Sequence, residues 1–560
     1  MRQSDWLAGV MALLAGGLAA GAGACVFSFD TTNCDDYPAP GCPGVSTTGN
    51  GGQGGTGGTG GHGGTGGTGG QGGDGGPTID CTGDPTTVVD EVGNIRDECA
   101  VFVSKTGKDD TGDGTMAKPY ATLGKAFGEA SSAKKPKVFA CAQTGQKLDE
   151  EVTLNAKLEV YGGFDCSAAA WTWQAAGRTQ VDGPADKVAW TIGALAGGAL
   201  VSGFTVKAGA PTPKSGNSSI AMAVADVAVT IKRCDLEALD GADGEDGTQP
   251  SDPVTPGADG STSVSNACAA DNQVFGANGG SVTCDDGMSV GGKGGKGGIT
   301  ANGSTGGTGE NGTPADATKG KGGAGAGAAD CVDGTKGANG GDGDPGVAGT
   351  AIGTLSLTGL TGGDGANGLL GKRGQGGGGG GAAKSGVFCA GGGGDVDGNG
   401  ASGGGGGSGG CGGKGGNGGK AGGSSIAMIS LGDKLTIDGS TVKLTAGKGG
   451  TGGKGAKGQV GGAFGFGKAG GTASAIPPSK AGCKGGDGGT GGAGGPSGGG
   501  RGGHAVGIAY AKTPAKEVTF TTPPAVGMAG AGGTIMGGNA GAPGEDGAAC
   551  DFSKTSKPCG

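Results

Sequence analysis

Aromatic residues and histidines are scarce in this sequence. Phenylalanine, tryptophan and tyrosine together make up 4% of the 560 residues, and hydrophobic residues of all kinds make up 33%. So little apolar surface cannot fill one compact core of this length. The two histidines, His62 and His504, exclude a histidine-rich metal cluster, and a Ser-His-Asp triad would have to use His504. We interpret His504 as a turn residue.

A basic surface stripe is also missing. The net charge is −10, and lysines are interspersed with aspartates along the chain. Because a phosphate backbone is bound by clustered lysine and arginine, we expect no nucleic-acid partner. The acidic balance favours solubility.

The cysteines lack the spacing of a metal or redox motif. No C-x-x-C pair occurs among the 16 cysteines, which argues against a zinc ribbon and a thioredoxin-type site. So many cysteines favour disulfides and an oxidising compartment. Spacing alone does not fix the connectivity, but close neighbours are reasonable partners. We predict the pairs Cys34/Cys42, Cys81/Cys99, Cys268/Cys284 and Cys550/Cys559.

The N-terminal segment has the pattern of an export signal. Arg2 precedes an apolar stretch from Leu7 to Ala24, which ends in an A-x-A site directly before Cys25. Ordinary signal peptidase would release a chain that begins at Cys25. The same small residues resemble a bacterial lipobox, although Ala22 stands where leucine is usual. We predict a signal peptide over residues 1–24 and a lipid anchor at Cys25 in the outer membrane.

Glycine dominates the composition, with 152 residues. Residues 25–77 contain a short cysteine-bearing segment and then a G-G-X array from Gly51 to Gly76. Glycine at two of every three positions leaves no side chains for a core, so we interpret this array as a tether. Two further glycine-dense stretches, 241–423 and 447–503, interrupt sequence of ordinary composition.

A segment of ordinary composition occurs twice, and a looser third copy follows it. Ser218–Met222 and Val229–Ile231 recur 206 residues later as Ser424–Met428 and Leu435–Ile437. Short repeated strands are typical of stacked repeats, in which each unit buries its apolar face against its neighbours. The side chains expected to point inward, at period two, are Val227, Val229, Ile231, Leu435 and Ile437.

Aromatic residues concentrate between Phe102 and Phe204, so the best-packed part of the fold is expected there. Pro119–Phe127 is predicted to be a short amphipathic helix, because its apolar residues share one face. Short strands separated by glycine turns are predicted at 101–104, 138–141, 152–154 and 158–161.

The region from Val101 to Val206 resembles the entry of secreted pectin-lyase-like β-helix proteins. The matching segments are Val101–Ser104, Gly112–Thr115, Lys118–Phe127, Val160–Phe164, Trp171–Trp173, Arg178–Gly183 and Leu200–Val206. The resemblance implies an all-β fold, a right-handed parallel β-helix solenoid, whose first helix caps the open end. It also implies that the three repeats are later rungs of one solenoid.

The predicted organisation follows from these patterns. A signal peptide (1–24) and a linker (25–77) precede the N-terminal cap and first rungs (78–240). A glycine-rich insertion (241–423), one rung (424–446), a second insertion (447–503) and the last rung with its tail (504–560) complete the chain.

The two insertions depart from the usual family pattern, and both disordered loops and ordered packing are open for them. Cysteines recur within them, and G-X-X or G-G-X periods persist, as in Gly365–Gly374. Glycine chains of this period can pack side by side as extended left-handed helices, because absent side chains permit close backbone approach. A collagen triple helix fits less well, because proline is scarce. We favour polyglycine II-like packing.

Aspartates supply the metal candidates. Asp395, Asp397 and Asn399 match the first half of a calcium loop, in which alternating oxygen ligands turn inward around a glycine. Gly406 stands where the bidentate glutamate belongs, so the loop is incomplete. Residues 108–114 show a similar incomplete pattern. We expect solvated turn aspartates and no cofactor, with calcium as the weaker alternative.

An enzyme on this fold would need convergent acidic and basic residues. Hydrolases use paired carboxylates, and the resemblance implies calcium-binding acidic residues plus a basic residue for lyases. Four acidic residues near Lys232 and Arg233 cluster only loosely, and their counterparts in the second copy are not acidic. We interpret them as surface charge: Asp226, Asp235, Glu237 and Asp240, which correspond in the gapless repeat to Gly432, Thr441, Lys443 and Ala446.

The function that we expect is an exported, cell-surface structural or adhesive role without catalysis. A glycan-binding module, with cell-surface or extracellular polysaccharide as partner, is one alternative. A polysaccharide lyase or hydrolase is the other, since fold alone does not establish chemistry. Trp171 and Trp173 could stack on a sugar ring, but we interpret them as packing residues.

Overall fold

The computed structural model describes residues 80–86, 95–299 and 303–559. Residues 77–560 form one compact unit. In the described part of this unit, α1 (Leu123–Ser132) is the single α-helix, and most strands pair in parallel. The chain is therefore all-β, as predicted. The signal segment, Cys25, His62, Cys34, Cys42 and the G-G-X tether lie outside the described residues.

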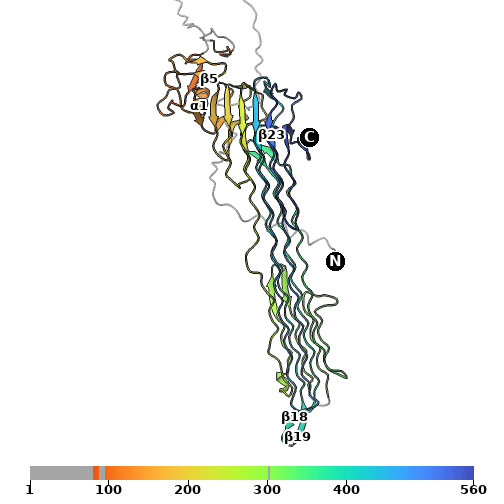
Figure 1. Cartoon of the computed structure of the whole chain (residues 1–560). Coiled ribbons are helices and arrows are strands. Elements are labelled where there is room, and N and C mark those ends of the chain that lie inside the picture. The colour runs from red at the N-terminus through yellow and green to blue at the C-terminus, as the bar shows by residue number, and fades with distance from the viewer. Residues whose placement is uncertain (1–79, 87–94, 300–302, 560) are drawn as a thin grey trace, which may run out of the picture. The chain divides into compact units, whose positions relative to one another are not determined.

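Through most of the chain outside the hairpins, successive strands visit three sheets in turn, and most strands pair in parallel with the preceding strand of their sheet (Figure 1). Sheet A contains β1 (Ala100–Val103), β2 (Lys137–Cys141), β5 (Glu159–Asp165), β9 (Ala199–Ser202), β12 (Val229–Lys232) and β21 (Leu435–Ile437), with β6 (Thr172–Trp173) antiparallel to β5. Sheet B contains β3 (Lys147–Asp149), β7 (Thr179–Asp182), β10 (Phe204–Lys207), β13 (Asp235–Ala238), β22 (Lys443–Ala446) and β24 (Ala525–Val526). Sheet C contains β4 (Val152–Leu154), β8 (Val188–Ile192), β11 (Ser219–Val224), β20 (Ser425–Ser430), β23 (Ala505–Tyr510) and β25 (Asp546–Asp551).

The sequence repeat sets the register in two of the sheets. Ser219 pairs with Ser425 in sheet C, and Val229 pairs with Leu435 in sheet A, at the spacing of the repeat. Sheet B is shifted by two residues, because the turn between β21 and β22 is longer than the turn between β12 and β13.

That shift corrects three of the expected equivalences. Asp235 pairs with Lys443, Glu237 with Thr445 and Ala238 with Ala446. The correspondences of Asp235 with Thr441, of Glu237 with Lys443 and of Asp240 with Ala446 are therefore wrong. A gapless sequence alignment cannot account for the longer turn between β21 and β22.

Inward side chains of the three sheets form the main core. Val229 and Ile231 are 2% and 0% exposed, and Ile437 is 9% exposed. Leu435 and Val227 are partly buried and pack against the same cluster. The predicted inward set is confirmed, because residues at period two along a strand share one face.

Helix α1 packs against the first strands with one apolar face, formed by Leu123, Ala126, Phe127 and Ala130. The helix begins at Leu123 rather than at Pro119, because Tyr120 forms a β-bridge with Val103 and Thr122 is the N-cap. The Glu150 carboxylate accepts the next two N–H groups, from Leu123 and Gly124 at 2.8 and 3.2 Å.

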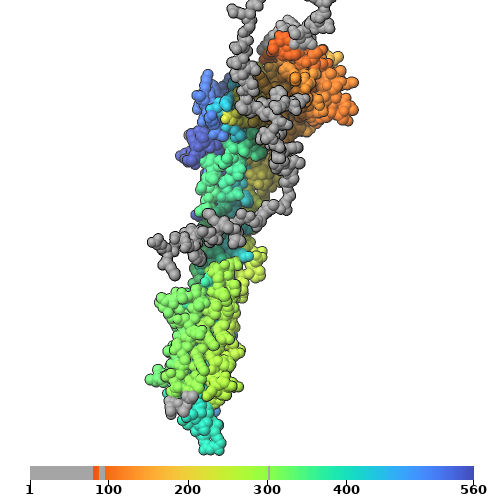
Figure 2. Space-filling model, turned by 180° about the vertical axis from the view of Figure 1, so that it is seen from behind, coloured from red at the N-terminus to blue at the C-terminus, as the bar shows by residue number. Residues whose placement is uncertain are grey.

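The glycine-rich stretches run side by side (Figure 1), and the space-filling view shows this part closely packed (Figure 2). Direct backbone hydrogen bonds join the stretches. The N–H groups of Gly334, Gly337 and Gly340 donate to the carbonyls of Lys484, Asp487 and Thr490 at 2.9, 2.9 and 2.8 Å. One bond therefore forms at every third residue along each pair of segments. We call this set of segments the glycine bundle: 241–280, 291–298, 304–313, 320–326, 332–349, 362–383, 399–423, 447–472, 482–504, 527–533 and 541–544.

Three consecutive residues of one segment bond to three different neighbours. Gly376 donates to Thr313 at 2.9 Å, Gly377 to Gly407 at 2.8 Å and Gly378 to Thr335 at 3.0 Å. A segment with glycine at all three positions can therefore lie inside the bundle, and residues 376–381 are all buried. In the G-G-K segment 291–296 the glycines are buried, whereas both lysines are exposed.

Three antiparallel hairpins interrupt the described glycine-rich stretches, and Asp271–Gln273 forms a short 3-10 turn. The hairpin β18–β19 lies at the end of the bundle that points away from the three sheets (Figure 1). The hairpins are β14 (Ser281–Cys284) with β15 (Gly287–Val290), β16 (Thr354–Ser356) with β17 (Gly359–Thr361), and β18 (Gly386–Gly391) with β19 (Gly394–Gly398).

Adding one methyl group inside the bundle tests this packing. A Cβ at Gly378 would lie 1.9 Å from the carbonyl oxygen of Lys321, so we expect Gly378→Ala to lower the free energy of unfolding by about 2–3 kcal/mol. Gly341 is the matched control, because a Cβ there meets nothing within 4 Å. Gly341→Ala should be neutral or stabilise by up to about 1 kcal/mol in denaturant unfolding. Equal effects of the two substitutions would contradict the packing.

Candidate functional site

The outward faces of the three sheets differ in what covers them. Phe102, Phe139 and Phe164 on sheet A pack with Trp171 in an aromatic cluster. The outer face of sheet C is apolar and is covered by leucines of the β16–β17 hairpin, including Leu355 and Leu360. Sheet B alone among the three carries a largely polar outer face, since its strands alternate between buried and partly or fully exposed residues.

The outer face of sheet B carries rows of opposite charges. Lys147 binds Asp182 at 2.7 Å and Asp149 at 3.1 Å. Lys207 binds Glu237 at 3.2 Å. The two lysine hydrogen bonds and charges lower the pKa of Asp149. These carboxylates are thus neutralised by neighbouring lysines, which suits an exposed polar binding face better than proton transfer.

The structure separates the acidic residues that the sequence grouped. Asp235 and Glu237 lie on the outer face of sheet B, whereas Asp226 precedes β12 and binds Lys434 at 3.5 Å. Asp240 follows β13 and accepts the N–H of Lys448.

The two basic residues also point elsewhere. Lys232 binds Asp84 at 2.9 Å. The guanidinium of Arg233 stacks 4.3 Å from the centre of the Trp173 ring and donates to the carbonyl of Ala175. Trp173 thus serves a packing contact, like buried Trp171.

The calcium candidates lie in the β18–β19 hairpin. Asp395 and Asp397 are exposed on the extended strand β19. Asn399 is 5% exposed, and its amide nitrogen donates to the Ala269 carbonyl at 2.8 Å and to the Asp271 carboxylate at 2.7 Å. Asp397 and Asn399 line a cavity of about 620 Å³. Among the described residues, no group of three or more His, Cys, Asp or Glu side chains could hold a metal ion.

The second incomplete calcium pattern is a hydrogen-bonded turn. The Asp109 carboxylate accepts the N–H groups of Ala121 and Thr122, at 2.8 and 3.2 Å. Asp113 accepts the hydroxyl of Thr115 at 2.6 Å, and these bonds to Thr115 lower the pKa of Asp113.

Six disulfides occur in the described part of the chain, and three of them join the glycine bundle to hairpins or loops beside it. The predicted pairs Cys81–Cys99 and Cys550–Cys559 are confirmed, and Cys141–Cys166 joins them. The pair Cys268/Cys284 is wrong. The bundle disulfides are Cys268–Cys389, Cys284–Cys411 and Cys331–Cys483, with sequence separations of 121, 127 and 152.

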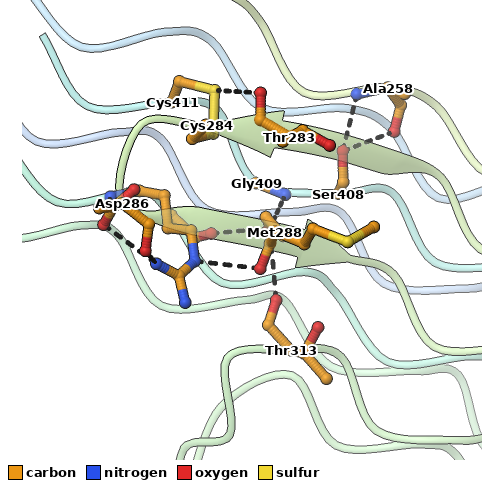
Figure 3. Close-up of a disulfide and its surroundings, with 12 residues drawn as sticks. Ala258, Thr283, Cys284, Asp286, Met288, Thr313, Ser408, Gly409 and Cys411 are labelled. Atoms are coloured by element: carbon orange, nitrogen blue, oxygen red, sulfur yellow. Dashed lines mark hydrogen bonds and ion pairs between the residues drawn. A yellow bond between two sulfur atoms is a disulfide. The ribbon is translucent and has the colours of Figure 1, made fainter. Parts of the chain in front are cut away.

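Hydrogen bonds reinforce one of these cross-links (Figure 3). Beside Cys284–Cys411, the Ser289 hydroxyl donates to the Gly374 carbonyl and accepts the N–H of Gly409, both at 2.8 Å. Arg373 binds the Asp286 carboxylate at 3.2 Å. The β14–β15 hairpin is thereby fixed onto the bundle. So many disulfides indicate an oxidising environment outside the cytosol.

A repeated contact at the edge of the bundle was not predicted from the sequence. Gly241 donates to the Lys448 carbonyl at 2.8 Å, and the Lys448 N–H donates to the Asp240 carboxylate at 2.7 Å. We call this reciprocal pair an Asx-Gly clasp. In it, the side chain of an Asp or Asn accepts the N–H of a residue on the neighbouring segment. The carbonyl of that residue accepts the N–H of the glycine that follows the Asp or Asn. The repetition of Asp-Gly or Asn-Gly at every third residue was the sequence pattern that could have predicted these contacts. The other clasps of this form join Asp243-Gly244 to Thr451, Asp246-Gly247 to Lys454, Asp259-Gly260 to Phe466, Asp333-Gly334 to Lys484, Asn339-Gly340 to Thr490 and Asp342-Gly343 to Ala493.

His504 lies where the bundle meets sheet C and is 2% exposed, so its interpretation as a turn residue is wrong. Its Nδ1 accepts the Glu545 N–H at 3.1 Å, and its Nε2 therefore donates to the Ile352 carbonyl at 3.1 Å. Burial, aided by the charge of Arg501, lowers the pKa of His504 to about 4. Both ring nitrogens are used by the backbone, which leaves none for a catalytic triad.

Comparisons with family models, curated proteins and solved structures found no match to this chain. None of the helices in the described residues is long and apolar enough to cross a membrane.

His504 should make the fold sensitive to acid. Between pH 6.5 and 4 the unfolded histidine binds a proton that the folded one does not, so the free energy of unfolding falls as the pH falls. The loss is roughly 3 kcal/mol by pH 4. We expect His504→Gln, measured by urea unfolding from pH 7.5 to 4, to lose this part of the pH dependence. An unchanged difference between pH 7 and pH 4 would contradict the assignment.

Proposed function

We propose that this protein is an exported, lipid-anchored cell-surface protein with a structural or adhesive role. Its base is a right-handed parallel β-helix solenoid of the pectin-lyase-like kind, and its glycine-rich insertions are polyglycine II-like helices. The cyclic A, B, C order of the strands supports the solenoid. Parallel crossovers are right-handed in nearly all proteins, which supports the hand.

The glycine bundle is the observation that carries this proposal. Backbone hydrogen bonds and three disulfides fix its segments, so the insertions act as a rigid rod. At about 3.1 Å per residue, the segment 447–472 spans roughly 80 Å. A rod of this kind separates its end from its base, which is useful to a protein that reaches away from a cell surface.

The end of the rod has the features of a contact surface. Most residues of the hairpin β18–β19 are exposed, apart from buried Phe388 and Cys389, and Val387 and Val396 on it are 55% and 46% exposed. The disulfide Cys268–Cys389 ties the hairpin to the bundle. The hairpin is therefore held in place and open to a partner surface.

The cysteine count supports the lipid anchor. Twelve of the 13 described cysteines form disulfides, and Cys234 is free and buried. The remaining three are Cys25, Cys34 and Cys42. If Cys34 pairs with Cys42, Cys25 has no partner for a disulfide, as a lipidated N-terminal cysteine requires.

Glycan binding on the outer face of sheet B is the second candidate. This face offers lysines and carboxylates in rows along the strands, the groups that hydrogen-bond to sugar hydroxyls. Cell-surface or extracellular polysaccharide is the partner class in this case.

The anchor is tested by Cys25→Ala in the full chain. We expect the variant protein to carry no radiolabelled fatty acid, because the acyl chain is attached at this cysteine. We also expect the variant protein to be released into the medium. The control is a Cys34→Ser/Cys42→Ser double variant, which should keep the label. Fatty acid retained on the Cys25→Ala protein would contradict the anchor.

The adhesive role is tested at the end of the rod. Cells that display the protein are placed under flow on polysaccharide-coated glass, and the number of cells retained is measured. We expect the double variant Val387→Asp/Val396→Asp to reduce this retention several-fold, because charges replace the exposed apolar contact. Val347→Asp/Val460→Asp is the matched control, since these valines are 69% and 81% exposed on other segments. Unchanged retention with the hairpin variant, but loss with Lys147→Glu/Lys207→Glu, would favour glycan binding by sheet B.

A further inference from the structure

Asn-Gly dipeptides are chemically fragile, and the bundle contains several of them. The glycine nitrogen can attack the asparagine side-chain carbonyl carbon, which forms a C–N bond and releases ammonia. Water then opens the five-membered succinimide to aspartate or isoaspartate. The reaction needs a free glycine N–H and a carboxamide that can turn toward it.

The Asx-Gly clasp occupies both of these groups. At Asn339, the side-chain oxygen accepts the Thr490 N–H at 3.1 Å, while the Gly340 nitrogen donates to the Thr490 carbonyl at 2.8 Å. Cyclisation would have to break both bonds at once. Because each bond is worth about 1 kcal/mol, we expect the clasp to slow the reaction roughly thirtyfold.

Other Asn-Gly pairs are held in related ways. Asn367 accepts the Gly418 N–H at 2.8 Å, and Gly368 donates to the Gly416 carbonyl at 2.9 Å. Asn311 accepts the Gly322 N–H at 2.9 Å while Gly312 donates to the Gly320 carbonyl. The amide nitrogens of Asn399 and Asn417 are hydrogen-bonded, and so are the N–H groups of Gly400 and Gly418.

Asn278-Gly279 differs from all of these. Its side chain is exposed, and within the described residues neither the Asn278 carboxamide nor the Gly279 N–H has a hydrogen-bond partner. We propose that Asn278 is a site of spontaneous covalent modification in the folded protein, by deamidation through a succinimide with Gly279. The clasp at Asn339 and the related hydrogen bonds of the other described Asn-Gly pairs protect those pairs. The modification adds one negative charge to the bundle surface and, as isoaspartate, one extra backbone carbon.

One pair of the same row shows what the clasp lacks when its N–H donor is missing. Pro496 lies in the same row as Lys484, Thr490 and Ala493, and Gly346 donates to its carbonyl at 2.8 Å. Proline has no N–H to donate. In this pair of Gly346 and Pro496, the residue before the glycine is Pro345, where the clasps have Asp or Asn.

The test uses the whole folded protein, incubated at pH 8 and 37 °C and followed by peptide mapping with mass spectrometry in H2¹⁸O. We expect Asn278 to convert at least roughly thirtyfold faster than Asn339 or Asn367, and all three to convert at similar rates in reduced, denatured protein. Asn278→Gln should abolish the conversion at this site without changing the unfolding midpoint. Equal rates at Asn278 and Asn339 in the folded protein would overturn the proposal.

A second variant tests the clasp itself. Thr490→Pro removes the N–H that holds Asn339 and copies the chemistry of Pro496. We expect it to accelerate conversion of Asn339 by about fivefold, while Asn367 stays protected. Acceleration at both residues would show loosening of the whole bundle instead, and no acceleration at Asn339 would refute the clasp mechanism.

Discussion

The direct hydrogen bond between neighbouring glycine-rich segments is the interaction on which most of this structure depends. A Cβ at most positions of the bundle that bear glycine would lie about 2 Å from a carbonyl oxygen, as at Gly292 or Gly379. Glycine is therefore required by the closeness of two backbones rather than by a turn. The same closeness satisfies N–H and C=O groups that would otherwise be buried without partners in a structure with few apolar side chains.

The hydrophobic core and the glycine bundle are stabilised by different interactions. In the three sheets, side chains such as Trp190 and Phe204 fill the interior and provide the apolar burial. In the bundle, close backbone packing, hydrogen bonds and disulfides replace that burial. The two parts meet where β20 and β23 follow directly on bundle segments, and buried His504 and Arg501 satisfy carbonyls of Ile352 and Thr350 there.

Side chains at the edge of the bundle accept hydrogen bonds from backbone N–H groups that have no backbone acceptor. A peripheral segment has one row of N–H groups without a backbone neighbour, and the Asp or Asn of each clasp supplies the missing acceptor. The aspartates that accompany glycine along the array therefore serve as acceptors as well as solubilising charges. In the same way, lysine pairs such as Lys468 with Asp259 lie on the surface, where each contributes little to stability.

The sequence by itself determined the strand-rich class, the inward residues Val229 and Ile231, and the pairing of the first two repeats, because period-two burial and a constant spacing are local properties. Closeness in sequence also predicted the disulfides Cys81–Cys99 and Cys550–Cys559, but the same criterion failed for Cys268/Cys284. Only the tertiary structure decided that Cys284 pairs with Cys411 and that His504 is buried. It alone separated Asp226 and Lys232 from the charged outer face of sheet B, and it alone paired Asp240 with Lys448. The Cys284–Cys411 and Asp240–Lys448 pairings depend on which glycine-rich segments lie side by side. Glycine-rich segments carry little side-chain pattern from which that choice could be predicted.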